Sequence, residues 1–441
     1  MIPSSPVAVP AFAAGAASVL LLWPSSGAQE SSTELGDLRR WTAEISPQVE
    51  ALRGLRFERP VPVEIATGED FRAYAQRQIE KMGDADQRRA IDRTAKLLGL
   101  FPADGDLWQA TIDLLTSQVG GYYDPETRSF SLMEGVSGPL AKSVLSHELV
   151  HALEDQHYEL GAKLEELSAE TDAAAAYHAV VEGTATLVQN RWMVEHGSQF
   201  TLDDLLELSE DMSMEAMFAA DPVLWVPTLF SYMGGQVFLH QGNSLLSAAM
   251  QPFEVARLDR AFSSPPRSTE QVLHPEKYWD PEQIDEPKTV KVVVPDGWRE
   301  MHSDVLGEVQ LALVAAGSDF VAPDPDDPNA VFTLEYTNDD AAGWDGDSAL
   351  LLEREGASAL VLASTWDTSE DRDEWHAALV KRVPALTAAA VTLSSASRGD
   401  VALLRSGELE HLLVVSVDVA GAGDRTGAQV LADALEVQVR P

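Results

Sequence analysis

The residues with the clearest chemical meaning stand in the segment HELVH, where His147 and His151 are four positions apart and Glu148 lies between them. On a helix this spacing places both imidazoles on one face, where they can bind a single metal ion. A carboxylate next to the first histidine can act as a general base toward a water on that ion. Zinc lowers the pKa of such a water to about 7, so a carboxylate can accept its proton at neutral pH. The segment therefore predicts a hydrolytic site with Zn2+ as its cofactor.

A third ligand must come from elsewhere, because catalytic zinc usually keeps three protein ligands and one open position. Glu182 is the favoured candidate: it lies in the middle of a predicted helix among apolar and small residues, where an unpaired carboxylate is costly to bury. The small residues after it should let this helix pack closely on the HELVH helix. His178 and His157 are rivals for the role. Asp155 is placed either to accept a hydrogen bond from a ligating histidine or to lie in solvent.

Two predicted helices carry these residues, one over about 139–158 with a proline in its first turn and one over about 170–195. Before them, 61–66 alternates like a strand, 69–100 has helical spacing, and 120–133 predicts a hairpin with its turn at 124–127. After them, 202–262 is mainly helical with a break at 221–222. Further along, the pattern predicts strands at 289–294, 349–353, 359–365, 401–404 and 411–417, and helices at 370–382 and 427–434.

These elements predict an α+β fold in two domains. Residues 29–288 would form a mainly helical domain with a small N-terminal sheet, and 289–441 a C-terminal α+β domain of unknown role. Residues 1–28 contain an apolar stretch and end in small residues, which predicts a signal peptide cleaved after Ala28. We therefore expect a secreted or periplasmic protein. The usual basic residue near the start is missing, so an N-terminal membrane anchor is the alternative.

Composition excludes several classes of function. The chain has 31 basic and 71 acidic residues, a formal net charge of −40, which opposes binding to nucleic acid and to anionic lipid. It contains no cysteine, so any metal must be held by nitrogen and oxygen ligands. No run after the N-terminal stretch is long and apolar enough to predict a membrane span. The nucleophile elbow of serine hydrolases, the phosphate-binding loop and the dinucleotide fingerprint are also missing from the sequence.

The sequence resembles the gluzincins, zincin metallopeptidases whose third zinc ligand is a glutamate on a second helix. In particular it resembles a group of largely uncharacterised secreted bacterial proteins of that class. The resemblance covers most of the chain after about residue 50, through the motifs GGYYDPETRSFSL, SHELVHALEDQH, VVEGTATLV, FSYMGGQVF, STEQVLHPEKY and AAGWDGD.

The resemblance implies a zincin-like fold, with His147, His151 and Glu182 as zinc ligands and Glu148 as the catalytic base. One position departs from it: thermolysin-like members carry an aspartate four residues after the ligand glutamate, where this chain has Thr186. This puts the support of the ligands from that side in doubt.

A peptidase also needs a donor for the developing oxyanion and a strand edge that binds its substrate. Tyr232 and His274 are the candidates for the donor, although either residue is equally consistent with a structural role. The predicted strand 121–124 is either the substrate-binding edge or an ordinary internal strand. We therefore predict an exported zinc metallopeptidase that acts on a peptide or protein substrate. The alternatives are a zincin scaffold that keeps the metal but serves as a binding or structural module, and a hydrolase of non-peptide amides.

Overall fold

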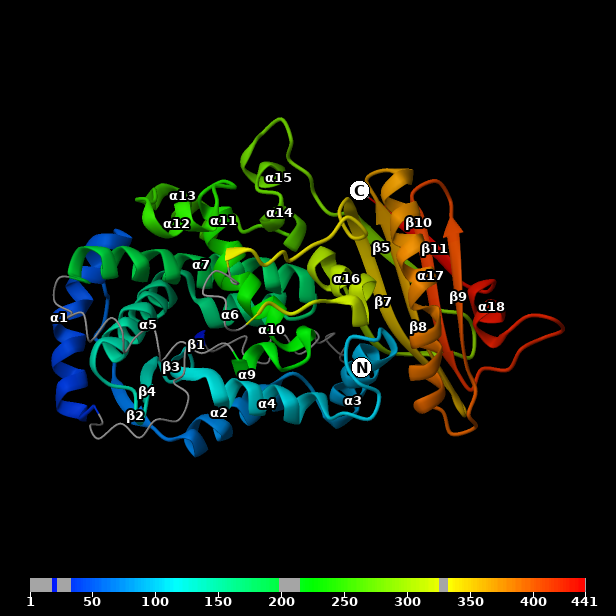
Figure 1. Ribbon diagram of the computed structural model, residues 1–441, viewed down its shortest axis with the longest axis horizontal. Coiled ribbons are helices and arrows are strands. Elements are labelled where there is room, and N and C mark those ends of the chain that lie inside the picture. The colour runs from blue at the N-terminus through cyan, green and yellow to red at the C-terminus, as the bar shows by residue number, and fades with distance from the viewer. Residues whose placement is uncertain (1–17, 22–32, 198–214, 325–331, 441) are drawn as a thin grey trace.

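The computed structural model describes residues 18–21, 33–197, 215–324 and 332–440. A larger part of the molecule is mainly helical and contains a small sheet, and a smaller part is a sheet flanked by helices (Figure 1). The predicted α+β class is thus confirmed. Among the described residues, no helix combines the length and the apolar character that crossing a bilayer requires.

The first elements of the larger part surround its small sheet. They are β1 (Ser18–Leu21), α1 (Leu35–Arg53), β2 (Val63–Ala66), α2 (Gly68–Lys81), α3 (Ala85–Leu97), α4 (Leu107–Gln118), β3 (Val119–Asp124) and β4 (Ser129–Met133). The sheet order is β1-β3-β4-β2, in which β3 pairs antiparallel with both β1 and β4. The predicted hairpin is confirmed as β3 and β4. The helical pattern at 69–100, however, is divided between α2 and α3.

The division of that pattern has a local cause. Gly83 adopts a φ of +132°, which the adjoining helical conformation does not allow, and Asp84 then caps the next helix. The Asp84 carboxylate accepts hydrogen bonds from the backbone N–H groups of Asp86 and Gln87. A glycine followed by an aspartate is a recognisable helix boundary, and here it outweighs the continuous helical spacing.

The two helices predicted to carry the site are confirmed as α5 (Gly138–Tyr158) and α7 (Thr171–His196), separated by the short α6 (Leu160–Leu167). The middle of α7 is buried on all sides, over 173–188. A helix in such a position must consist mainly of small and apolar residues, and each polar group on it needs a partner. Glu182 is a carboxylate in the middle of this buried stretch, so it needs such a partner.

A series of short helices follows α7. They are α9 (Glu215–Phe218), α10 (Pro222–Leu229), the π-helix η3 (Phe230–Gly234), α11 (Gly235–Leu239), α12 (Leu245–Met250), α13 (Val255–Ser263), α14 (Thr269–Leu273) and α15 (Glu276–Trp279). Those from η3 to α14 pack against α7. The predicted break at 221–222 is confirmed, because α10 starts at Pro222. Residues 202–214 of the predicted helical region lie outside the described residues.

The smaller part is built on an antiparallel sheet with the order β6-β7-β8-β10-β9. Its elements are β5 (Thr289–Val293), β6 (Arg299–Asp304), α16 (Gly307–Ala316), the 3-10 turn η4 (Gly317–Asp319), β7 (Trp344–Arg354), β8 (Ala357–Trp366), α17 (Ser369–Thr392), β9 (Gly399–Ser406), β10 (Glu410–Val417), α18 (Gly427–Ala432) and β11 (Glu436–Arg440). The predicted strands and helices of this region are all present. Four others, β6, α16, η4 and β11, were not predicted.

Both faces of this sheet are covered, which explains its nearly continuous apolar strands. Leu360 and Leu362 of β8 belong to the main core, whereas Val361 and Ala363 belong to a second, smaller core on the opposite face. The main core also contains residues of α5 and α7, so it extends through both parts of the molecule. The predicted boundary at 288/289 lies between α15 and β5 and does not separate two hydrophobic cores.

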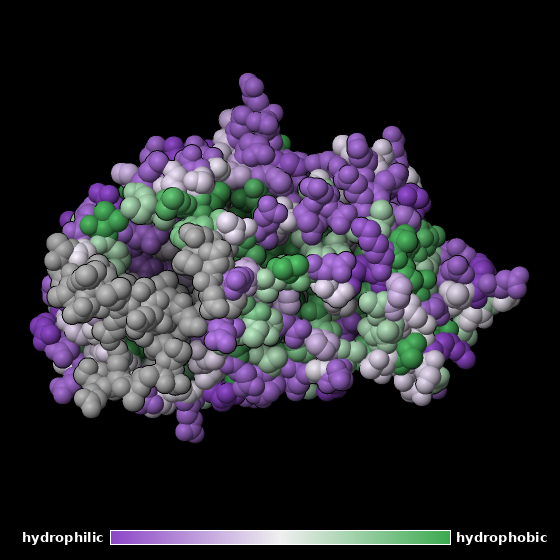
Figure 2. All heavy atoms as spheres, in the orientation of Figure 1, coloured by the Kyte–Doolittle hydropathy of each residue, from purple (hydrophilic) through white to green (hydrophobic). Residues whose placement is uncertain are grey.

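Two buried aspartates make hydrogen bonds at the start of α7, and one of them, Asp304, connects the two parts. Asp304, at the end of β6, accepts hydrogen bonds from the backbone N–H and the hydroxyl of Thr171, at 2.8 and 2.6 Å. Asp172 accepts from the backbone N–H and the hydroxyl of Thr269, at 2.7 and 2.6 Å, and so caps α14. The smaller part therefore supplies the cap of the helix that carries Glu182. Figure 2 shows hydrophilic residues around the rim of one face of the molecule and hydrophobic residues gathered across its middle.

Candidate metal centre

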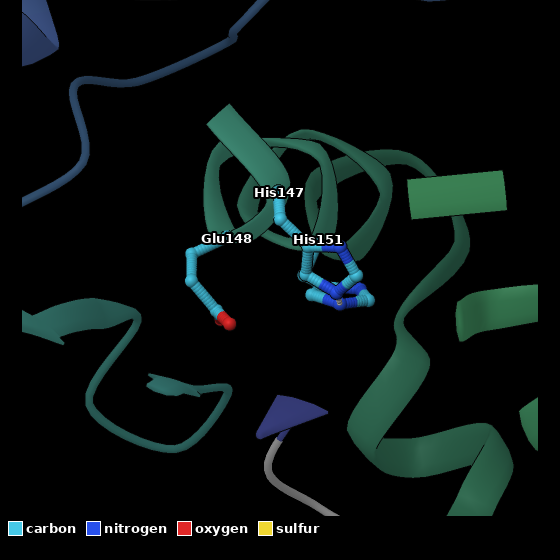
Figure 3. Close-up of side chains that lie close together, drawn as sticks. All are labelled: His147, Glu148 and His151. Carbon is cyan, nitrogen blue, oxygen red and sulfur yellow. Dashed lines mark hydrogen bonds between the residues drawn. The ribbon is translucent and has the colours of Figure 1, made fainter. Parts of the chain in front are cut away.

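His147, Glu148 and His151 lie together on α5 and are completely buried. The Nε2 atoms of His147 and His151 are 2.9 Å apart, and a carboxylate oxygen of Glu148 lies within 4.8 Å of a ring nitrogen of each histidine. Figure 3 shows the three side chains leaving α5 in the same general direction, with the carboxylate beside the two rings. The helical spacing alone produces this arrangement, as the sequence predicts.

Glu182 of α7 completes the group. Its Oε2 lies 3.1 Å from the Nε2 atom of His147 and 3.4 Å from that of His151. Ligands about 2.0–2.1 Å from a tetrahedral zinc ion are separated by roughly 3.4 Å. The observed separations of 2.9, 3.1 and 3.4 Å are close to this value, and the donor set is two imidazoles and one carboxylate. These three side chains fit a zinc ion with one open position.

The protonation states of the group also suit a metal. Burial lowers the pKa of His151 to about 4, which leaves its imidazole neutral at physiological pH. Burial opposes the ionisation of Glu182, but the surrounding histidines outweigh this effect and hold its pKa well below the usual value. A neutral imidazole and an ionised carboxylate are the forms that bind a metal cation.

Gln189, which was not among the predicted site residues, orients His147. The Gln189 amide nitrogen donates hydrogen bonds to the carbonyl and the hydroxyl of Ser143, at 3.2 and 2.9 Å. Its Oε1 therefore faces the Nδ1 of His147, 3.3 Å away. This contact places the proton of His147 on Nδ1 and turns the lone pair of Nε2 toward the centre. Gln189 lies two turns after Glu182 on α7 and therefore on the same face of the helix. This spacing could have identified it from the sequence as a residue near the centre.

The hypothesis that Asp155 supports a ligating histidine is wrong. Asp155 instead accepts a hydrogen bond from the hydroxyl of Tyr123 on β3, at 2.9 Å. His157 is also outside the centre, since its Nε2 lies 2.8 Å from the carbonyl oxygen of Arg56. Thr186, which stands where thermolysin-like proteins have aspartate, donates its hydroxyl to the backbone carbonyl of Glu182 at 2.7 Å.

The helix α7 packs on α5, as predicted. Gly183, beside Glu182, makes a further close contact that was not predicted, with Gly235 of α11. A Cβ added at Gly235 would lie 2.0 Å from the carbonyl oxygen of Ala179 and 3.0 Å from the Cα of Gly183. This close contact brings the preceding π-helix, with Ser231 and Tyr232, against the Glu182 side of α7.

Tyr232 lies in the group around the centre. Its ring stacks on that of His147, with the ring centroids 5.7 Å apart and the planes inclined by 18°. Its hydroxyl is hydrogen-bonded to Glu182, and burial together with the nearby carboxylates of Glu182 and Glu148 raises its pKa well above the usual value. The phenol therefore stays protonated. A π-helix segment often marks a functional site, and this one carries Tyr232.

His274 has a different partner from the other predicted residues. Its Nε2 lies 3.1 Å from both carboxylate oxygens of the buried Glu308 on α16, and this contact raises the pKa of His274. Thr337 donates a hydrogen bond to the same carboxylate. The contact with Glu308 accounts for the position of His274 by itself, so Tyr232 is the better supported of the two candidate donors.

A second group of acidic residues, Glu270, Asp285 and Asp367, is also close enough to bind a cation. Lys277 already occupies its middle, with Nζ at 2.6, 2.9 and 2.8 Å from the three carboxylates. The ammonium group contacts all three carboxylates and offsets part of their charge, so this cluster already holds a cation of the chain itself.

The outer edge of β3 is occupied. β1 pairs antiparallel with β3, with Ser18 opposite Tyr123 and Val19 opposite Tyr122. β1 also contacts α5, and in Figure 3 it is the short dark blue strand below the labelled side chains. The strand β3, which was predicted as a possible substrate-binding edge, is therefore paired with a segment from within the predicted signal peptide.

Comparison with known protein families gives a match over part of the chain. The model of a family described as a domain of unknown function (DUF8575) matches residues 292–422, which form most of the smaller part. No curated protein and no solved structure matches the chain.

Proposed function

We propose that this protein is a zinc-dependent metallopeptidase of the gluzincin type. The observation that carries the proposal is the convergence of His147, His151 and Glu182 at separations of 2.9 to 3.4 Å, with Glu148 beside them. Burying two imidazoles and two carboxylates at one point, without a cation, costs free energy that a bound zinc ion would recover. The donor set, its burial and its protonation states all favour Zn2+.

In the proposed mechanism, zinc supplies Lewis-acid chemistry by polarising the scissile carbonyl and lowering the pKa of a water. Glu148 accepts the proton of the attacking water and passes it to the nitrogen of the departing amine, so that the peptide C–N bond breaks as the new C–O bond is completed. Tyr232, which keeps its proton, donates a hydrogen bond to the developing oxyanion. The contact of Gln189 Oε1 with His147 Nδ1 keeps His147 in the tautomer whose Nε2 lone pair faces the centre.

The substrate in this proposal is an extended peptide. The pairing of β1 with β3 indicates that this edge accepts an antiparallel strand beside α5. Removal of residues 1–28 as a signal peptide would take β1 away and leave the backbone groups of β3 available for hydrogen bonds with substrate. Because a signal peptide is removed during export, we also propose that the protein is exported from the cytoplasm. The net charge of −40 makes nucleic acid an unfavourable partner.

The test compares wild type with Glu148→Gln, both starting at Gln29. Wild type should bind one zinc ion per chain, measured by elemental analysis, and cleave members of a peptide library, measured by mass spectrometry. Glu148→Gln should keep the zinc and lose cleavage by roughly a hundredfold or more, since a general base contributes about 10²–10⁴. Glu165→Gln, an exposed position on α6, is the matched control and should behave as wild type.

Each failure has its own meaning. Zinc binding without any cleavage that Glu148→Gln removes would favour the alternative, a metal-bearing scaffold that serves as a binding or structural module. Cleavage of small amides but not of peptides would favour an amidohydrolase. A wild-type protein that binds no zinc would refute the proposal.

A further inference from the structure

The Glu182 carboxylate uses its two oxygens differently. Oε2 faces the two ligating histidines, whereas Oε1 lies 3.3 Å from the Nε2 atom of His178, four residues earlier on α7. Both residues are buried, Glu182 completely and His178 with 5% of its surface exposed. The terminal torsion of a glutamate is soft, so a carboxylate needs a partner on its second oxygen to keep one orientation.

His178 is itself fixed from a second helix. Its Nδ1 lies 3.2 Å from the Oγ of Ser231, and the Ser231 hydroxyl is 3.0 Å from the carbonyl oxygen of Pro227 one turn earlier. Ser231 is completely buried and belongs to the π-helix that also carries Tyr232. The contact of Gly235 with Gly183 holds this π-helix against α7. The ring of His178 is thus held at Nδ1 by Ser231, while its Nε2 faces Oε1 of Glu182 at ion-pair distance.

We propose that His178 is a positioning residue, which acts through Glu182 and is anchored by Ser231. Its role is to hold the Glu182 carboxylate in one orientation, so that Oε2 is the oxygen that would face a zinc ion at the site. The proposal rests on the proposed zinc site. In the sequence, the spacing of four residues between His178 and Glu182 is consistent both with this role and with simple packing.

Two substitutions separate the nitrogens of His178. In His178→Gln the amide nitrogen is at about the reach of Nε2 and can still donate to Glu182. In His178→Asn the amide group is at about the reach of Nδ1, so it can still contact Ser231 but no longer reaches Glu182. His196→Asn is the control: it is a histidine of the same helix whose ring contacts the carbonyl of Trp192.

The readouts are the zinc dissociation constant, from competition with a chelator, and the visible spectrum of the Co2+-loaded protein, which reports ligand geometry. His178→Asn should weaken zinc binding roughly 10- to 100-fold, the usual effect of losing a partner of a metal ligand, and should change the Co2+ spectrum. His178→Gln should remain close to wild type in both measurements. His196→Asn should change neither.

Ser231→Ala provides a second test that leaves both Glu182 and His178 in place. It should weaken zinc binding less than His178→Asn does, and it should have no further effect when combined with His178→Asn, because the two act through one contact. Equal zinc affinity and equal spectra for wild type and His178→Asn would overturn the inference while leaving the zinc site intact. A wild-type chain that binds no zinc would overturn both proposals. If His178→Asn does not fold, Ser231→Ala with wild-type affinity and spectrum decides against the inference.

Discussion

Replacement of Gly235 by alanine should damage the metal centre from a position that carries no functional group. An added Cβ would lie 2.0 Å from the carbonyl oxygen of Ala179, whereas an ordinary contact of carbon with a carbonyl oxygen is about 3.3 Å. The helices α7 and α11 must therefore separate by roughly 1.3 Å, the difference between these two distances. Backbone atoms cannot rotate away as a flexible side chain can. We expect a loss of about 1–3 kcal/mol in the free energy of unfolding, the usual cost of overpacking.

The same displacement should also affect function. It would move Tyr232 and Ser231, one turn before Gly235, away from Glu182 and His178 on α7. A misplacement of about 1 Å near a reacting group can reduce the rate roughly a hundredfold. Gly235→Ala should therefore lower kcat/KM for peptide cleavage by more than its effect on stability explains, at a temperature where the variant is fully folded.

The assays are urea denaturation followed by circular dichroism, and steady-state cleavage of a peptide substrate. Gly36→Ala is the control because no heavy atom lies within 4 Å of its added Cβ, and alanine in α1 should stabilise by about 0.5–1 kcal/mol. If Gly235→Ala unfolds at the same urea concentration as wild type and cleaves equally well, the close crossing of α7 and α11 is not what positions the site.

Two further predictions concern stability. Burial raises the pKa of Asp172 to about 8 and that of Asp304 to about 7, above the usual 3.8, so the folded state binds more protons and the free energy of unfolding should fall as pH rises from 6.5 to 8.5. Urea denaturation across this range should show the decrease, and Asp172→Asn should flatten it; an increase with pH would contradict the reasoning. Arg53→Ala removes the cation 2.6 Å from the buried Glu154 and should cost about 3–5 kcal/mol, measured in the same way. The exposed Arg40→Ala should cost no more than about 1 kcal/mol, and equal losses for the two variants would contradict the difference in burial.

Elements with strong local signals were predictable from the sequence. The helix α5 has a proline in its first turn and an apolar set at helical spacing, and the hairpin of β3 and β4 has a proline in its turn. Two of the missed elements, β6 and α16, lack such signals. The strand β6, REMHSD, has no apolar alternation, and α16, GEVQLALVAA, is buried all around and has no polar face. Periodicity cannot identify an element that has no contrast between its faces.

By itself, the sequence determined the arrangement within one helix: four residues make about one turn, so His147 and His151 share a face and Glu148 lies beside them. The choice of Glu182 also followed from local context, because a carboxylate among small apolar residues needs compensation. Only the tertiary structure decided which partners orient these groups. Gln189 rather than Asp155 contacts His147, Ser231 fixes His178, and Gly183 packs against Gly235 of α11. Such contacts depend on how separate helices cross, and the crossing is set by packing over the whole core rather than by local spacing.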